Sequence, residues 1–145
     1  MITPGEKMNS KIVVGDADSL VALADKQDSN NSKAVKITTW LLSKDYEIIY
    51  PNTAILEAIT ALKRAKNLPD KANLIAEQYL EGAFAVQFIS EMIQSQATQR
   101  FIKTNSKQDT IFDCLVAEVA LELKADFVFS FDKFYTKQGL SLVEV

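Results

Sequence analysis

The apolar residues of this chain follow two different periods. Short runs rich in β-branched and aromatic residues, typical of buried strands, alternate with longer segments whose apolar residues recur at helical spacing. The short runs predict strands over residues 12–14, 47–51, 83–89, 126–132 and 140–145. The longer segments predict helices over residues 19–25, 33–46, 52–68, 70–82, 90–105 and 109–125. Strands separated by helices imply parallel crossover connections, so we expect an α/β fold, with a three-layer α/β/α arrangement around a central, mainly parallel sheet.

Length and composition are those of a single globular unit. The 145 residues are 48% hydrophobic and 24% charged, which is ordinary for a domain large enough to have a hydrophobic core. We expect a loose N-terminal tail over residues 1–10 and a single domain over residues 11–145. The start of the chain lacks the apolar core of a signal peptide, and no run approaches the ~20 apolar residues of a membrane helix. With one cysteine, Cys114, a reducing cytoplasmic setting is expected.

The chain contains no histidine. This excludes Ser-His-Asp and Cys-His catalysis and the usual zinc sites. Any metal would have oxygen ligands, which favours hard ions such as Mg²⁺ or Mn²⁺. The net charge of −3 argues against a broad basic surface that coats nucleic acid, but it is compatible with an enzyme whose basic contacts are local.

The first candidate functional residues are Asp16 and Asp18, which follow the first apolar run. In a parallel sheet they lie at the strand-to-helix turn, on the edge where α/β proteins bind ligands. Three interpretations fit: the aspartate nucleophile of a haloacid-dehalogenase-like phosphatase, the first acid of a metal-dependent nuclease, or a structural turn. In the structural turn, Asp18 or Ser19 caps the helix and Asp16 is solvated. The phosphatase needs a further strand–helix unit after Ser130, and only fifteen residues follow it here, so we do not expect that reaction.

Three further acids stand in comparable places. Asp132 follows the last long strand and so shares with Asp16 the carboxyl edge of the predicted sheet. Glu57 interrupts an apolar helix, and Asp113 lies near the start of the clearest helix. Crowded carboxylates repel one another, which favours protonation or a bound cation. Two hard cations ~3.5–4 Å apart can activate water and stabilise the leaving oxygen in phosphodiester hydrolysis, and this chemistry needs no histidine.

Each acid also has a structural interpretation that the sequence leaves open. Asp113 completes a capping-box pattern in "TIFD". Glu57 fits a rim residue whose carboxylate reaches water, and Asp132 in "FDKF" fits a turn acid. The remaining loop and cap aspartates are expected to be structural, namely Asp25, Asp28, Asp45, Asp70, Asp109 and Asp126.

The acids lie in four ordered motifs: "DADSLVAL" with Asp16, "TAILEAITAL" with Glu57, "DCLVAEVA" with Asp113, and "SFDKFY" with Ser130 and Asp132. By these motifs, and over almost the whole chain from residue 12, the sequence resembles the PIN domain family. Within that family it resembles the small VapC-type toxins of toxin–antitoxin pairs. One position departs from the family pattern, because Asp18 stands where the family generally has Ser or Asn.

The resemblance implies a Mg²⁺- or Mn²⁺-dependent ribonuclease on a parallel-sheet α/β/α fold. Asp16, Glu57, Asp113 and Asp132 would form the catalytic and metal-binding pocket, and Ser130 would hydrogen-bond or assist a ligand. Water activated by the metal would attack an RNA phosphodiester. Family members usually form homodimers, and a cognate antitoxin protein fills or blocks the pocket of a toxin. Two basic groups flank the acids and could position phosphates: Lys63, Arg64 and Lys66, and Lys103, Lys107 and Lys133.

A second hypothesis is a PIN-fold module that binds RNA or a protein without cutting. The presence of all four acids argues against it. The residues alone do not separate a toxin from an RNA-processing or RNA-decay nuclease, and they do not select between the two metals.

Overall fold

The computed structural model describes residues 11–145, and the tail expected over residues 1–10 lies outside the described residues. Its elements are, in chain order, β1 (Ile12–Gly15), α1 (Ala17–Ala24), α2 (Asn31–Ser43), β2 (Glu47–Pro51), α3 (Asn52–Lys63), α4 (Pro69–Leu80), β3 (Ala85–Gln87), α5 (Glu91–Ile102), α6 (Ile111–Glu122), β4 (Phe127–Phe129) and α7 (Phe134–Lys137). The strands form one sheet in the order β3-β2-β1-β4, and every neighbouring pair is parallel. The predicted α/β/α fold around a parallel sheet is confirmed.

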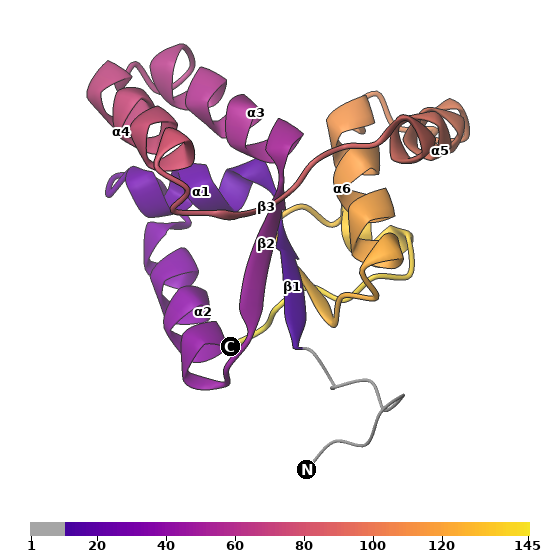
Figure 1. Cartoon of the computed structure of the whole chain (residues 1–145), viewed down its shortest axis with the longest axis horizontal. Helices are drawn as coiled ribbons and strands as arrows, with labels where there is room; N and C mark the ends of the chain where they lie inside the picture. The colour runs from indigo at the N-terminus through magenta and orange to yellow at the C-terminus, as the bar shows by residue number, and fades with distance from the viewer. Residues whose placement is uncertain (1–10) are drawn as a thin grey trace.

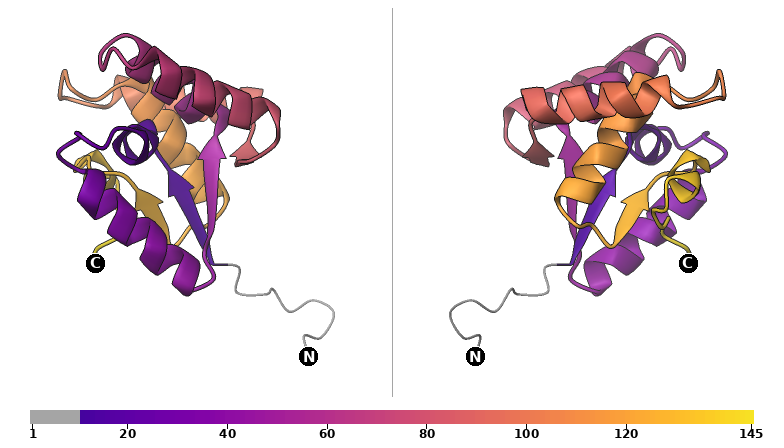
Figure 2. Two further views of the ribbon diagram at one scale, coloured as in Figure 1. Left: turned by 90° about the vertical axis from the view of Figure 1, so that its left-hand side faces the viewer. Right: turned by 90° about the vertical axis from the view of Figure 1, so that its right-hand side faces the viewer.

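Helices cover both faces of the sheet. Figure 1 shows β1 and β2 between α2 on one side and α6 on the other, and Figure 2 shows these two helices from their own sides. Successive side chains of a strand point to opposite faces. Val13 accordingly packs in a cluster with Ile37 of α2, whereas Val14 packs in a larger cluster with Val116 of α6. No helix within residues 11–145 is both long and apolar enough to cross a membrane.

Three local expectations differ from the structure. The strand expected over residues 140–145 makes only one β-bridge, between Val128 and Leu142. The short helix α7 was not anticipated, and Gly139 follows it in the left-handed region at φ 81°. The helix expected over residues 52–68 ends at Lys63, because the chain turns through Asn67, which also has a positive φ of 52°.

The sheet brings two distant parts of the chain to one edge. β1 and β4 are neighbours, and Gly15 pairs with Phe129 at their carboxyl ends. The backbone N–H of Asp16 donates to the carbonyl of Phe129 at 3.1 Å. The residues that follow these two strands therefore meet, although more than a hundred positions separate them in the sequence.

Gly15 leaves room for a buried tyrosine at this edge. A Cβ at residue 15 would lie 2.1 Å from Cε1 of Tyr50. The Tyr50 ring is buried, and its hydroxyl shares a 3.0 Å hydrogen bond with the hydroxyl of Ser19. A side chain at residue 15 would therefore force the Tyr50 ring to shift and would strain this hydrogen bond.

We expect Gly15→Ala to lower the free energy of unfolding by about 1–3 kcal/mol, the usual cost of overpacking a core. Urea unfolding measures this change. In a Tyr50→Leu background the same substitution should cost less, because the ring is gone. Equal costs in the two backgrounds would show that the Tyr50 ring is not the cause.

Candidate active site

Asp16 is buried where β1 passes into α1. It caps the helix, since its Oδ1 accepts a hydrogen bond from the N–H of Ala17 at 2.7 Å. The hydroxyl of Tyr135 donates to its Oδ2 at 2.6 Å. Ser19 does not cap, because its hydroxyl donates to the carbonyl oxygen of Asp16. The interpretation with a solvated Asp16 and a cap at Asp18 or Ser19 is therefore wrong, since burial and Tyr135 fix Asp16 in the interior.

Asp18, in the first turn of α1, connects that helix to the end of β4. Its Oδ2 accepts two hydrogen bonds of 2.8 Å, from the hydroxyl of Ser130 and from the N–H of Phe131. Its Oδ1 is buried and has no hydrogen-bond partner within the described residues. One carboxylate oxygen of Asp18 thus holds the turn after β4.

Ser130 carries this connection on to Asp132. The Ser130 hydroxyl donates to Asp18, and the oxygen of the same hydroxyl accepts from the N–H of Asp132 at 3.1 Å. Asp132 is exposed, and its Oδ1 accepts from the N–H of Phe134 at 2.9 Å, which is the turn geometry expected as its structural role. Ser130 is buried, and its hydroxyl is engaged on both sides by Asp18 and Asp132.

Asp113 and Glu57 come from α6 and α3. Asp113 is buried and forms a capping box with Thr110, in which its Oδ2 accepts from the Thr110 N–H at 3.0 Å and its own N–H donates to the Thr110 hydroxyl at 3.2 Å. The structural interpretation of Asp113 is thus confirmed, and it leaves Oδ1 outside the cap. Glu57 is half-buried in the second turn of α3.

All four predicted acids and Asp18 line one hollow of about 340 Å³, which we call the acidic hollow. Its lining residues are Asp16, Ala17, Asp18, Val21, Asp28, Asn30, Glu57, Ala61, Asp113 and Asp132. None of these lining residues is a lysine or arginine, and Ser130 is not among them. The structure therefore brings the four acids together, while Ser130 lies behind the hollow and contacts it through Asp18 and Asp132.

Burial and the charge of neighbouring acids raise the pKa of four of these carboxyls, those of Asp16, Asp18, Glu57 and Asp113. The pKa of Asp16 is raised well above its ordinary value, first by burial and then by the charge of Asp18. Burial also raises the pKa of Asp18, and that of Asp113. For Glu57, burial and then the charge of Asp113 raise the pKa to about 7. The protein groups around the hollow therefore do not fully stabilise the ionised form of these carboxyls.

The donor set suits a hard divalent cation, which prefers carboxylate oxygens. The unpartnered Oδ1 of Asp18 supports this fit, because a buried carboxylate oxygen normally has a hydrogen-bond or metal partner. Within residues 11–145, no group of three or more acidic, cysteine or histidine side chains is arranged to hold an ion as it stands. A cation would therefore have to draw in the more exposed carboxylates, Asp132 and Glu57.

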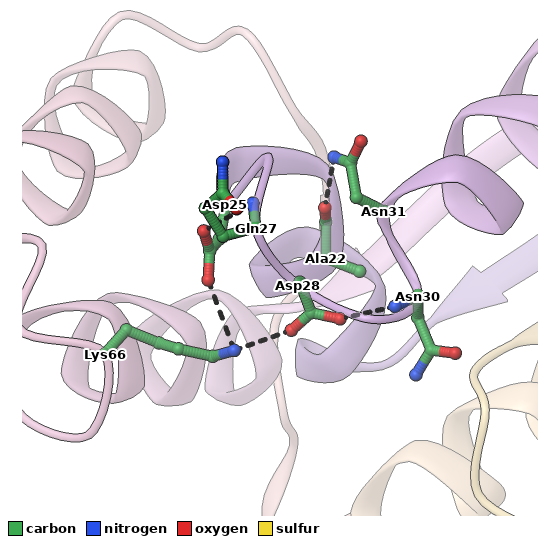
Figure 3. Close-up of polar contacts among 7 residues, drawn as sticks. All are labelled: Ala22, Asp25, Gln27, Asp28, Asn30, Asn31 and Lys66. Carbon is green, nitrogen blue, oxygen red and sulfur yellow. Dashed lines mark hydrogen bonds and ion pairs between the residues drawn. The ribbon is translucent and has the colours of Figure 1, made fainter.

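The loop between α1 and α2 forms one rim of the acidic hollow, and Figure 3 shows how it is held. The ammonium of Lys66 lies 2.7 Å from Oδ2 of Asp28 and 3.2 Å from Oδ2 of Asp25. Asp28 also accepts from the N–H of Asn30 at 2.8 Å, and hydrogen bonding to Lys66 lowers its pKa. Lys66, proposed from the sequence as a phosphate contact, is therefore already engaged. The side chain of Asn30 points away from Lys66.

Sequence reasoning missed several residues around the hollow. Tyr135 and Tyr50 place hydroxyls beside Asp16 and Ser19, and their letters carry no signal that separates them from other core aromatics. Asp28 and Asn30 were expected to be ordinary loop residues, yet both line the hollow. An aspartate followed two positions later by asparagine is typical of turns, so local sequence could not reveal this placement.

Comparisons with known proteins agree with this geometry. The model of the family described as "PIN domain" matches residues 13–137. No curated protein gives a match to the sequence. Among solved structures, VapC20 of Mycobacterium tuberculosis, described as a sarcin–ricin loop cleaving toxin, is similar with a TM-score of 0.79 and 17% sequence identity, over 90% of this chain and 98% of that chain. At this identity the likeness to VapC20 concerns the fold. Because the family model spans most of the sequence, the chain belongs to the PIN domain family.

Proposed function

We propose that this protein is a Mg²⁺- or Mn²⁺-dependent endoribonuclease and the toxin of a toxin–antitoxin pair. The observation that carries the proposal is the acidic hollow, in which five carboxylates from four segments of the chain line one space. The pKa values of Asp16, Asp18, Glu57 and Asp113 are raised there. A site with this charge and no lysine or arginine in its lining favours hard cations over anions. Phosphodiester hydrolysis is the reaction that such cations support without histidine.

The acids take different roles in this proposal. Asp16, Asp113, Asp132 and Glu57 would hold the cations. Protein donors fix the orientation of three of them, namely Tyr135 and the Ala17 N–H for Asp16, the Thr110 N–H for Asp113, and the Phe134 N–H for Asp132. Such hydrogen bonds orient metal ligands and tune their basicity. When bound, the divalent cations would supply an activated water and stabilise the charge on the leaving oxygen.

Family membership and the fold shared with VapC20 support the proposed substrate, partner and location. The substrate would be an RNA, the location cytoplasmic, and the partner a cognate antitoxin that blocks the acidic hollow. A basic side chain of the antitoxin is the natural occupant of a hollow lined by carboxylates, because it would neutralise the same charge that a cation neutralises.

RNA cleavage with Mn²⁺, with EDTA and by Asp113→Asn tests the function. Asparagine can still accept from the Thr110 N–H, so the cap survives while the charge is lost. We expect cleavage of a mixed pool of structured RNAs with Mn²⁺, none with EDTA, and a loss of about 10²-fold or more in Asp113→Asn, within the range for removing a catalytic electrostatic group.

Asp45→Asn is the matched control, because it removes the same charge from an exposed residue whose positive φ of 62° suits asparagine. It should cleave like the natural protein. Absence of cleavage together with absence of Mn²⁺ uptake would contradict the proposal and favour the non-catalytic binding module.

Asp18 has a separate prediction, because its two oxygens have different surroundings. Asp18→Asn keeps an oxygen that accepts from Ser130 and Phe131, whereas Asp18→Ala removes it. If Asp18 positions the segment that carries Asp132, the alanine variant should lose about 10–100-fold in activity and the asparagine variant much less. Equal losses in steady-state cleavage assays would instead identify the free Oδ1 as a cation ligand.

The homodimer is proposed at an apolar hollow beside the acidic one. Thr53, Leu56, Glu57, Thr60, Ala61 and Phe112 line this hollow of about 470 Å³. Leu56 and Phe112 are 51% and 43% exposed and lie together in this hollow, and a contiguous exposed apolar patch is typical of a protein–protein interface. We expect Leu56→Asp to shift the protein from dimer to monomer in light scattering. A control, Leu80→Asp at the far end of α4, should leave the dimer intact, and a monomeric natural protein would contradict this assignment.

A further inference from the structure

A second hollow, of about 600 Å³, is lined by residues of α5, of the connection from α5 to α6, of α6 and of the end of α7, and we call it the polar hollow. Every residue that lines it is polar or charged: Gln96, Gln99, Arg100, Lys103, Thr104, Asn105, Ser106, Asp109, Glu118, Lys137 and Gln138. None of the four predicted acids belongs to it. It is therefore a separate site, with a chemistry different from that of the acidic hollow.

Arg100 organises the floor of the polar hollow. Its Nε donates to Glu118 and its Nη1 donates to Oε1 of Gln138, both at 2.7 Å. The side chains of Arg100 and Glu118 are only 24% and 12% exposed, so this ion pair is fixed and its charges cancel. Because the amide oxygen of Gln138 is used by Arg100, the amide nitrogen of Gln138 remains to donate to a ligand.

The remaining charges of the polar hollow favour an anion. Lys103 and Lys137 are exposed and form no ion pair within residues 11–145. Asp109 is the single acid of the lining that an ion pair does not neutralise. Two free ammonium groups against one carboxylate give a local positive balance in a protein whose net charge is −3.

The uncharged side chains narrow the class of anion. Gln96, Gln99 and Asn105 each present an amide with both a donor and an acceptor. Such amides pair with the edges of unstacked bases, while lysines contact phosphates. A lining that combines amides with ammonium groups fits a short stretch of single-stranded RNA better than a free phosphate, which would use only the donors.

The two hollows border the same parts of the chain. Asp109 lines the polar hollow and Asp113, one turn further on, lines the acidic hollow, with the helix cap Thr110 between them. Asp109 is also close enough to contribute to the raised pKa of Asp113. On the other side, Asp132 precedes α7, which carries Lys137. The two hollows are therefore neighbours along the start of α6 and along the segment from Asp132 to Lys137.

We propose that the polar hollow binds a single-stranded segment of the RNA substrate next to the scissile phosphodiester. Lys103 and Lys137 contact its phosphates, and Gln138 with the neighbouring amides contacts its bases. This assignment rests on the proposed function, because it takes the acidic hollow as the place of cleavage. In this proposal Lys103, Lys137 and Gln138 determine the affinity for RNA and do not take part in the chemical step.

The double variant Lys103→Ala/Lys137→Ala tests the assignment, with Lys36→Ala/Lys44→Ala as a control of equal charge on exposed lysines in and just after α2. Fluorescence anisotropy in the slowly cleaving Asp113→Asn background gives the affinity for a mixed-sequence single-stranded RNA over a series of salt concentrations. We expect weaker binding for the first pair only. The slope of log affinity against log salt should fall by about 1.4, since each phosphate contact contributes about 0.7 with single strands. In the natural background, the first pair should raise KM and leave kcat unchanged.

Each other outcome overturns a defined part of the account. Equal effects of the two pairs, or no effect of either while the natural protein cleaves RNA, would overturn the polar hollow alone. Polyglutamate serves as a probe for an acidic protein segment. If Lys103→Ala/Lys137→Ala loses binding of polyglutamate while RNA binding is unchanged, the polar hollow binds an acidic protein segment instead. Dependence of RNA binding on Lys103 and Lys137 in a protein that never cleaves would retain the RNA site and overturn the nuclease. No binding and no cleavage would overturn both.

Discussion

The crowding of carboxylates at the carboxyl edge of a parallel sheet is the constraint on which the rest of this structure depends. Asp16 and Asp113 are buried, and burial raises the pKa of both. Leaving such groups without partners would be costly, so the surrounding fold supplies donors from several elements: Tyr135, the N-terminus of α1, Thr110 and the turn after β4. These donors orient the acids without neutralising them. The charge that remains is the basis of the proposed cation site.

The pairing of β1 with β4 turns this constraint into a defined geometry. Gly15 and Phe129 are in register, and Asp18 ties the start of α1 to Ser130 and Phe131. Asp132 is thereby held beside acids that come from the other end of the chain. The substitution of the family's Ser or Asn by Asp18 is accommodated because one of its oxygens makes both contacts. The polar hollow has a positive charge balance and the acidic hollow a negative one, so the proposed RNA binding and the proposed cleavage take place at different sites.

Much of this arrangement could be predicted from sequence, because its signals are local and periodic. The strand at residues 12–14, the helix that carries Asp113 and its capping box all follow from apolar spacing and short motifs. The convergence of the acids could be predicted because parallel strands end at a common edge. The partners of these acids could not, since Tyr135 and Asn30 reach the site only through packing between distant segments. The strand expected over residues 140–145 was reduced to one bridge, because apolar alternation cannot show how far an edge segment pairs.

Calorimetric titration of the whole protein with Mn²⁺ at pH 7, in two buffers of different ionisation enthalpy, tests the central claim most directly. The pKa values of Asp16, Asp18 and Asp113 are raised and that of Glu57 is about 7, so part of the cluster is protonated at this pH. Cation binding lowers these pKa values, so Mn²⁺ binding should release protons, and this release should decline toward pH 9. The Asp113→Asn variant should bind Mn²⁺ more weakly. No uptake, or uptake without proton release that Asp113→Asn leaves unchanged, would contradict the claim that the acidic hollow is a cation site.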